Sequence, residues 1–348
     1  ESIAEIDFID IIIDITGYLK QEKQYEKIFD LNDAITKCNY DVMKGKLYYL
    51  EKALVDYCLF LGQREQLKNH LKSYLADPVE AIDYLITLLD KLNFYGESDL
   101  ALEISEHVFD IVKDSEGLMG GSEEDFANTI LMLEFQSLFQ KIKNGQKIDR
   151  KKIMKRLKDY GYELKDEFDS IFDTLSSDGW NGSKYGYNEY LQDKKRFNNS
   201  LMLLFCKYFL EEKKINFVAG SEIWLVALTF FHKNNPDKAL EYPFDGYFKL
   251  DDERYERNLA NRLGLLSNKK ANGVAVSYGM HYVYDFLYAS GLISKEKYDE
   301  SLEIVKEKRI LVLMALGSEA WEYGFIRVWE RPTSISAEEY ELECGLIE

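Results

Sequence analysis

Two glycines, Gly62 and Gly96, constrain the fold of this chain more than any other feature of its sequence. Each follows one apolar stretch with helical spacing and precedes another, as expected of a turn between two helices. Glycine suits such turns because it readily adopts the left-handed backbone conformation that often ends a helix. The offset from Gly62 to Gly96 matches the period of about 34 residues that is typical of repeated helical hairpins. The sequence therefore predicts two equivalent antiparallel helix pairs.

The hairpin around Gly96 has the clearer helix signals. Its first helix is predicted to start at Asp77-Pro78, with an acidic N-cap, proline at the first helical position and Glu80 three residues after the cap. One apolar face of this helix is formed by Ile82, Leu85, Ile86, Leu89 and Leu92. The matching face of the second helix is formed by Leu100, Ala101, Ile104, Val108 and Ile111.

The same pattern occurs one period earlier, around Gly62. Its apolar positions are Val55, Cys58, Leu59, Leu67, Leu71 and Tyr74. Over residues 40–114 the chain resembles the tetratricopeptide-like superfamily of α-solenoids, although most of that family's signature Trp, Tyr and Pro positions are absent. The resemblance implies a right-handed superhelix whose helices approach closely five positions after each turn glycine. Ala101 suits this contact, whereas Leu67 predicts a looser or differently angled pair.

The predicted fold class is all-α, with antiparallel helix pairs stacked as a tetratricopeptide-like right-handed superhelix. Only four prolines occur in 348 residues, which favours helix. A more globular C-terminal half is the alternative. We expect helical hairpins over residues 1–117, a helical connector with a basic stretch and a Gly/aromatic loop over 118–188, and a C-terminal helical domain over 189–348. Capping signals predict further helix starts near Ser122, Asn235, Asp251 and Ser294.

The net charge of −18 bears on the class of partner. Such a balance repels phosphate backbones, and no basic stripe with interleaved aromatic residues is present, so nucleic acid is not an expected partner. A basic protein partner would be favoured through electrostatic steering, although acidity also simply keeps proteins soluble. The most apolar stretches, such as Ile310–Leu316, are short, so no membrane span is expected.

The four cysteines, Cys38, Cys58, Cys206 and Cys344, are widely spaced. They indicate thiols in a reducing compartment, and we expect a cytoplasmic protein. Because the chain opens on Glu1, the native N-terminus and secretion are left open. The oligomeric state is also left open.

No pattern of residues predicts catalysis, a metal site or a cofactor. None of the four histidines has a second His or a Cys three or four residues away, and no phosphate-binding glycine loop or nucleophile elbow is present. Ser177-Asp178 lacks a nearby histidine, and Asp251-Asp252-Glu253 lacks the spacing of a calcium loop. We therefore predict no catalytic residues, no metal and no cofactor, and a non-enzymatic role is favoured.

Residues 176–188 form the longest stretch without helical spacing and contain three glycines. Functional loops often have this composition. We expect Trp180, Tyr185 and Tyr187 to contribute to partner binding. The alternative is that these aromatic side chains fold inward and pin two parts of the chain together.

A second candidate site lies between Gly273 and Phe286, where small residues give way to aromatic ones. Small residues allow two helices to pack closely, and they also leave room for a ligand. If a pocket is present, we expect Tyr278, His281 and Tyr282 to form its wall. Close helix packing without a ligand is the alternative.

Together these observations favour a non-enzymatic scaffold or adaptor that binds a protein or peptide on a helical-repeat surface. One alternative is an acidic inhibitor, such as an immunity protein or antitoxin, that neutralises a basic effector by charge complementarity. Another is an all-α enzyme with its site near His281 or in the 176–188 loop.

Overall fold

The computed structural model describes residues 8–37, 48–115, 121–164, 167–180, 193–231, 243–264, 267 and 269–347. Within these residues the chain is all-α, as predicted, with fifteen α-helices and a 3₁₀ segment, η3, that is kinked at Tyr323. The one β-type pairing found there is an isolated antiparallel bridge between Phe231 and Leu250. No helix in the described segments has both the length and the apolar character needed to cross a membrane.

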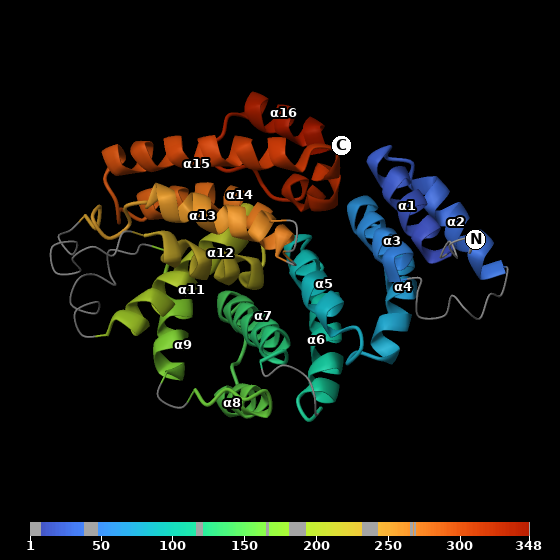
Figure 1. Cartoon of the computed structure of the whole chain (residues 1–348). Coiled ribbons are helices and arrows are strands. Elements are labelled where there is room, and N and C mark those ends of the chain that lie inside the picture. The colour runs from blue at the N-terminus through green and yellow to red at the C-terminus, as the bar shows by residue number, and fades with distance from the viewer. Residues whose placement is uncertain are drawn as a thin grey trace.

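The helices follow one another in three groups along the chain (Figure 1). The N-terminal group consists of α1 (Phe8–Gln21), α2 (Tyr25–Lys37), α3 (Tyr48–Leu61), α4 (Arg64–Ala76), α5 (Ile82–Phe94) and α6 (Ser98–Val112). The middle group consists of α7 (Glu124–Lys143), α8 (Arg150–Asp159) and α9 (Phe168–Ser176). The C-terminal group consists of α11 (Lys194–Lys213), α12 (Phe217–Phe230), α13 (Asp252–Leu263), α14 (Lys270–Ala289), α15 (Lys295–Leu316), η3 (Gly317–Arg327) and α16 (Ala337–Ile347).

The two predicted hairpins are present as α3–α4 and α5–α6, and their helices begin in register. The first helices open at Tyr48 and Ile82 and the second helices at Arg64 and Ser98, each pair at the same offset as the two glycines. Gly62 has φ +67° and Gly96 has φ +80°. In each turn the glycine N–H donates a hydrogen bond to the carbonyl three residues earlier, at 3.1 Å for Gly62 and 3.2 Å for Gly96. The N–H of the residue after each glycine donates to the carbonyl five residues before it, at 2.8 Å in the first turn and 2.9 Å in the second. The glycines therefore occupy equivalent helix-ending turns.

The predicted start of the first Gly96-hairpin helix is wrong. α5 begins at Ile82, and residues 77–81 form turns. The Asp77 carboxylate does accept a hydrogen bond from the Glu80 N–H, but the bond is long at 3.4 Å. Tertiary packing of an apolar face stabilises a helix more than one weak cap does, and the buried face of α5 begins at Ile82.

Other predicted helix starts agree with the structure where they can be compared. The Asp251 carboxylate accepts a hydrogen bond from the Arg254 N–H at 3.1 Å and caps α13. The Ser294 hydroxyl caps α15 in the same way. α7 begins within the capping run predicted at Ser122. The start predicted at Asn235 lies outside the described residues.

A segment from the C-terminal end of the chain packs against both hairpins. η3 contacts α3 and α5. This close packing requires glycine at position 324, because a side-chain carbon at Gly324 would lie 2.6 Å from Phe60 and 3.0 Å from the Tyr95 hydroxyl. Trp321 packs edge-on against Phe60, with ring centroids 5.8 Å apart. Beyond η3, the Trp329 indole donates to the Phe94 carbonyl at 2.8 Å. This segment ties the N-terminal helices to the C-terminal group.

α14 is the central helix of the C-terminal group. Seventeen consecutive residues, Ala271–Leu287, are buried, because α5, α11, α12, α13, α15 and η3 all pack around it. Its glycines permit two of these contacts. A side-chain carbon at Gly279 would lie 2.5 Å from Ile223 of α12, and one at Gly273 would lie 3.0 Å from the Arg262 Cβ of α13. The small residues of α14 thus serve close helix packing.

The domain boundaries predicted near residues 117 and 188 fall within 116–120 and 181–192, which lie outside the described residues. Side chains from all three predicted segments belong to one cluster of buried residues, which includes Leu85, Phe126 and Tyr282. None of the described cysteines, Cys58, Cys206 and Cys344, forms a disulfide, and Cys38 lies outside the described residues.

Candidate functional site

A groove of about 550 Å³ opens among α7, α9, α11 and α12. Figure 1 shows these four helices as neighbours, and they pack against one another. Buried apolar side chains from three of these helices form its floor: Met132, Phe135, Leu203 and Val218. Leu225 of α12 continues the apolar lining at the rim and is 54% exposed. An apolar concavity edged by a few polar groups is the usual form of a ligand site.

On the α9–α11 side of the groove, the lining contains two acidic residues, Glu167 and Asp193, and two basic residues, Lys195 and Arg196. Lys195 lies 3.8 Å from Glu167, and the Asp193 carboxylate caps α11 by accepting the Arg196 N–H at 3.0 Å. The Arg196 side chain donates from Nε to the Ser170 hydroxyl at 3.0 Å. This side of the rim is therefore close to charge balance.

The α7–α12 side is acidic. Asp125, in the first turn of α7, and Glu222 of α12 both line the groove, and we refer to these two residues as the acidic wall. Glu222 Oε2 accepts a hydrogen bond from the Asn272 side chain at 2.5 Å. The side-chain amide oxygen of Asn272, Oδ1, in turn accepts a hydrogen bond from Arg262 Nη1 at 2.5 Å. The amide of Asn272 thus stands between the Arg262 guanidinium and the Glu222 carboxylate.

A third carboxylate, Asp90 of α5, interacts with the acidic wall, although it does not line the groove. Burial, together with repulsion from Glu222 and Asp125, raises the pKa of Asp90 well above its ordinary value. Burial and the Asp125 carboxylate also raise the pKa of Glu222, and burial raises the pKa of Asp125. The positive charges of Lys269 and Arg262 lower the pKa values of Asp90 and Glu222, but by less than burial and repulsion raise them. Burial is thus the largest cause of all three shifts, and repulsion between the carboxylates adds to it for Asp90 and Glu222.

The arrangement suits binding of an amphipathic ligand. The apolar floor would exclude water from a bound side chain, and the acidic wall would attract a cation. No group of three or more His, Cys, Asp or Glu residues within the described ranges has the arrangement of a metal site.

Trp180, one of the predicted loop residues, lies at the end of the described segment 167–180. Its indole is partly buried against the main core, and its ring lies edge-on to Tyr208 with centroids 5.6 Å apart. This packing favours the alternative in which Trp180 anchors the chain. Tyr185 and Tyr187 lie outside the described residues.

Tyr278 and His281 are both buried in α14 and belong to one polar network around Arg309. His281 Nε2 lies 2.6 Å from Arg309 Nη1, and Nδ1 lies 2.9 Å from the Ser334 hydroxyl. Because arginine can only donate, Nε2 accepts and Nδ1 carries the proton. Burial, with the charges of Arg309 and Lys306, lowers the pKa of His281, in keeping with this neutral form.

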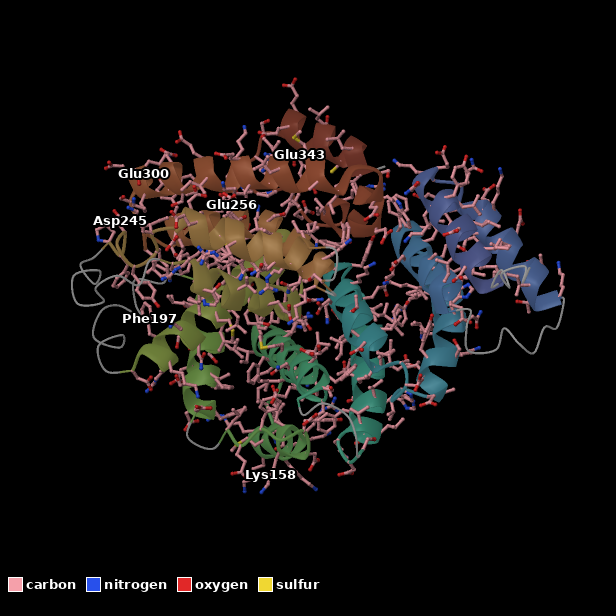
Figure 2. All side chains as sticks on the ribbon, in the orientation of Figure 1. Lys158, Phe197, Asp245, Glu256, Glu300 and Glu343 are labelled. Carbon is pink, nitrogen blue, oxygen red and sulfur yellow. The ribbon has the colours of Figure 1, made fainter. Side chains whose placement is uncertain are left out.

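The same network fastens α16 to the rest of the chain. Arg309 lies 2.7 Å from Glu343, which is labelled on α16 in Figure 2 and also accepts the Tyr278 hydroxyl at 2.5 Å. Tyr282, the third predicted residue of α14, donates to the Glu330 carbonyl at 2.9 Å. The structure therefore brings these predicted residues into the interior, and none of them lines the groove.

The residues of the groove carried little signal in the sequence. Asp125 belongs to the Ser122–Asp125 run, which predicts helix capping rather than ligand binding. Glu222 is a single acid within an apolar stretch, one of 62 acidic residues in the chain. Comparisons of the chain with protein-family models, curated proteins and solved structures gave no match.

Proposed function

We propose that this protein is a non-enzymatic interaction module that binds a peptide segment of a partner protein in the groove among α7, α9, α11 and α12. The observation that carries the proposal is the groove itself, with its buried apolar floor and polar rim. Helix-lined grooves of this kind accept the apolar face of an extended or helical segment, and the rigid walls limit the entropy lost on binding.

Two further proposals concern the fold and the setting of this module. We propose that residues 48–112 are two repeats of the tetratricopeptide type, supported by helix starts and turn hydrogen bonds that recur at the offset between Gly62 and Gly96. We also propose a cytoplasmic location, supported by described cysteines that form no disulfide. Cell fractionation with a folded, tagged full-length chain tests the second proposal.

Selection from a displayed library of random peptides tests the binding function. The immobilised full-length protein is the bait, and each enriched peptide is then titrated against two variants of matched chemistry. Leu225→Gln removes exposed apolar surface in the groove, whereas Leu311→Gln does the same on α15, where the leucine is 50% exposed. We expect peptides that lose affinity for Leu225→Gln and keep it for Leu311→Gln.

A second groove variant covers the case in which Leu225 contributes too little to peptide binding for its loss to be measured. Asn199→Trp places a large side chain on the exposed α11 edge of the groove. Circular dichroism of each variant confirms that the fold is retained. If no selected peptide discriminates either groove variant from Leu311→Gln, the groove is not the binding site and the proposal is wrong.

A further inference from the structure

The charges around the groove are distributed unevenly. Its lining contains four carboxylates, Asp125, Glu167, Asp193 and Glu222, and two cations, Lys195 and Arg196. Both cations lie on the α11 side, beside the Glu167 and Asp193 carboxylates. The excess negative charge is therefore confined to the acidic wall, Asp125 and Glu222.

The basic residues nearest to the acidic wall do not neutralise it directly. Arg262 directs Nη1 to Asn272, at 2.5 Å, and Nε to Asn258, at 2.6 Å, so its described hydrogen bonds go to amides and not to carboxylates. Lys269 is exposed, and its attraction is spread over Asp90, Asp125 and Glu222. Within the described residues, Asp125 makes no side-chain hydrogen bond or ion pair.

A third carboxylate, Asp90, interacts with the two residues of the acidic wall. Asp90 stands on α5, outside the groove lining, and its carboxylate repels those of Glu222 and Asp125. A positive group placed beside the wall would interact favourably with the Asp125 and Glu222 carboxylates at once. Because Glu222 is partly buried, the attraction is screened less than it would be between exposed charges.

We propose that the occupant of the groove is a basic–apolar segment: a peptide with an apolar side chain on the floor formed by Met132, Phe135 and Leu203 and a lysine or arginine cation between Asp125 and Glu222. This proposal rests on the proposed function and specifies the chemistry of the partner. Charge complementarity at the wall selects the basic residue, and the apolar floor selects its neighbour.

The test uses the peptides selected above and two variants that remove one charge each. Glu222→Gln can keep the hydrogen bond from Asn272, and Asp125→Asn keeps the shape of an exposed side chain. Asp83→Asn is the matched control, because Asp83 is an exposed aspartate in the first turn of α5, as Asp125 is in the first turn of α7. We expect selected peptides to contain Lys or Arg beside apolar residues and to lose about tenfold in affinity with each wall variant.

The outcomes separate this proposal from the proposed function. Peptides that depend on Leu225 but lack a basic residue, or that bind the wall variants as tightly as the unchanged protein, would overturn the basic–apolar assignment and leave the groove as a binding site. Equal losses with Asp83→Asn would show attraction by the net charge alone and would also overturn it. Peptides that ignore Leu225→Gln and Asn199→Trp would overturn both proposals.

Discussion

The two helical hairpins α3–α4 and α5–α6 share their register and their turns but place an equivalent aspartate in opposite surroundings. Asp56 of α3 and Asp90 of α5 are separated by the same offset as Gly62 and Gly96. Asp56 lies 2.6 Å from Lys91, and both side chains are almost fully buried. Lys20 and Lys52 also interact with Asp56. Burial and the Glu222 and Asp125 carboxylates instead raise the pKa of Asp90, against the weaker opposing effect of Lys269 and Arg262.

This difference separates a carboxylate that is paired with a buried lysine from one that neighbouring carboxylates repel. The Asp56–Lys91 pair joins α3 to α5, and Tyr323 of η3 lies over the lysine, with its ring centroid 5.7 Å from Nζ. A pair of this kind is closed to outside partners. Asp90 occurs at the same point of the pattern, but α5 packs there against α12 and α14 of the C-terminal group, and the Glu222 and Asp125 carboxylates repel that of Asp90. The two aspartates occupy equivalent positions in the two hairpins, and the helices packed beside each one determine its surroundings.

The largest effect is expected from neutralising the two aspartates in turn. Asp56→Asn leaves the buried Lys91 ammonium without its carboxylate, and we expect a loss of about 3–5 kcal/mol in the free energy of unfolding. Asp90→Asn removes a charge that its surroundings disfavour, so stability at pH 7 should stay the same or rise. Urea denaturation followed by circular dichroism measures both. Equal losses in the free energy of unfolding for the two variants would show that Asp56 and Asp90 do not differ in this way.

The position five residues after each turn glycine provides the next test. Leu67 and Ala101 are both buried, at 1% and 0% exposure. Leu67→Ala should open a cavity and cost about 2–5 kcal/mol, whereas Ala101→Leu should overpack its contact and cost about 1–3 kcal/mol. Chemical denaturation of each single variant measures these values. Tolerance of Ala101→Leu would show that the helices of the second hairpin do not need a small residue there.

The turn glycines should behave alike, in contrast to the aspartates. A side-chain carbon at Gly62 or Gly96 would meet nothing within 4 Å, so alanine is opposed only by the positive φ. We expect Gly62→Ala and Gly96→Ala each to cost about 1–2 kcal/mol. Thermal and urea unfolding provide the comparison. A clear inequality between the two would mean that the turns are less equivalent than their hydrogen bonds indicate.

The smallest effect is the pH dependence that Asp90 contributes. Because its pKa is raised in the folded protein, its stabilising contribution is fully present below the unfolded pKa and is lost as pH rises through the folded value. The stability of the unchanged protein relative to Asp90→Asn should therefore fall as pH rises above about 4, the ordinary aspartate pKa, and through the raised folded pKa. Urea midpoints across this range measure the difference, with Asp83→Asn as the exposed control. A difference that grows with pH would contradict the raised pKa.

The sequence by itself determined the all-α class and the turns of the two hairpins. These features depend on local physics: apolar spacing selects helix, and a glycine with positive φ closes hydrogen bonds to carbonyls three to five residues earlier. Local signals were less reliable for a helix boundary. The N-cap at Asp77 was outweighed by the buried face of α5, which begins at Ile82.

Only the tertiary structure decided the candidate site. Asp125, Ile171, Leu203 and Glu222 line one groove although they are far apart in the chain, and no periodic pattern relates them. The aromatic and histidine residues that the sequence favoured, Tyr278, His281 and Tyr282, instead became buried because six elements pack around α14. Whether an aspartate meets lysines, as Asp56 does, or carboxylates, as Asp90 does, depends on which distant helices pack beside it, and burial then sets how strongly those charges act.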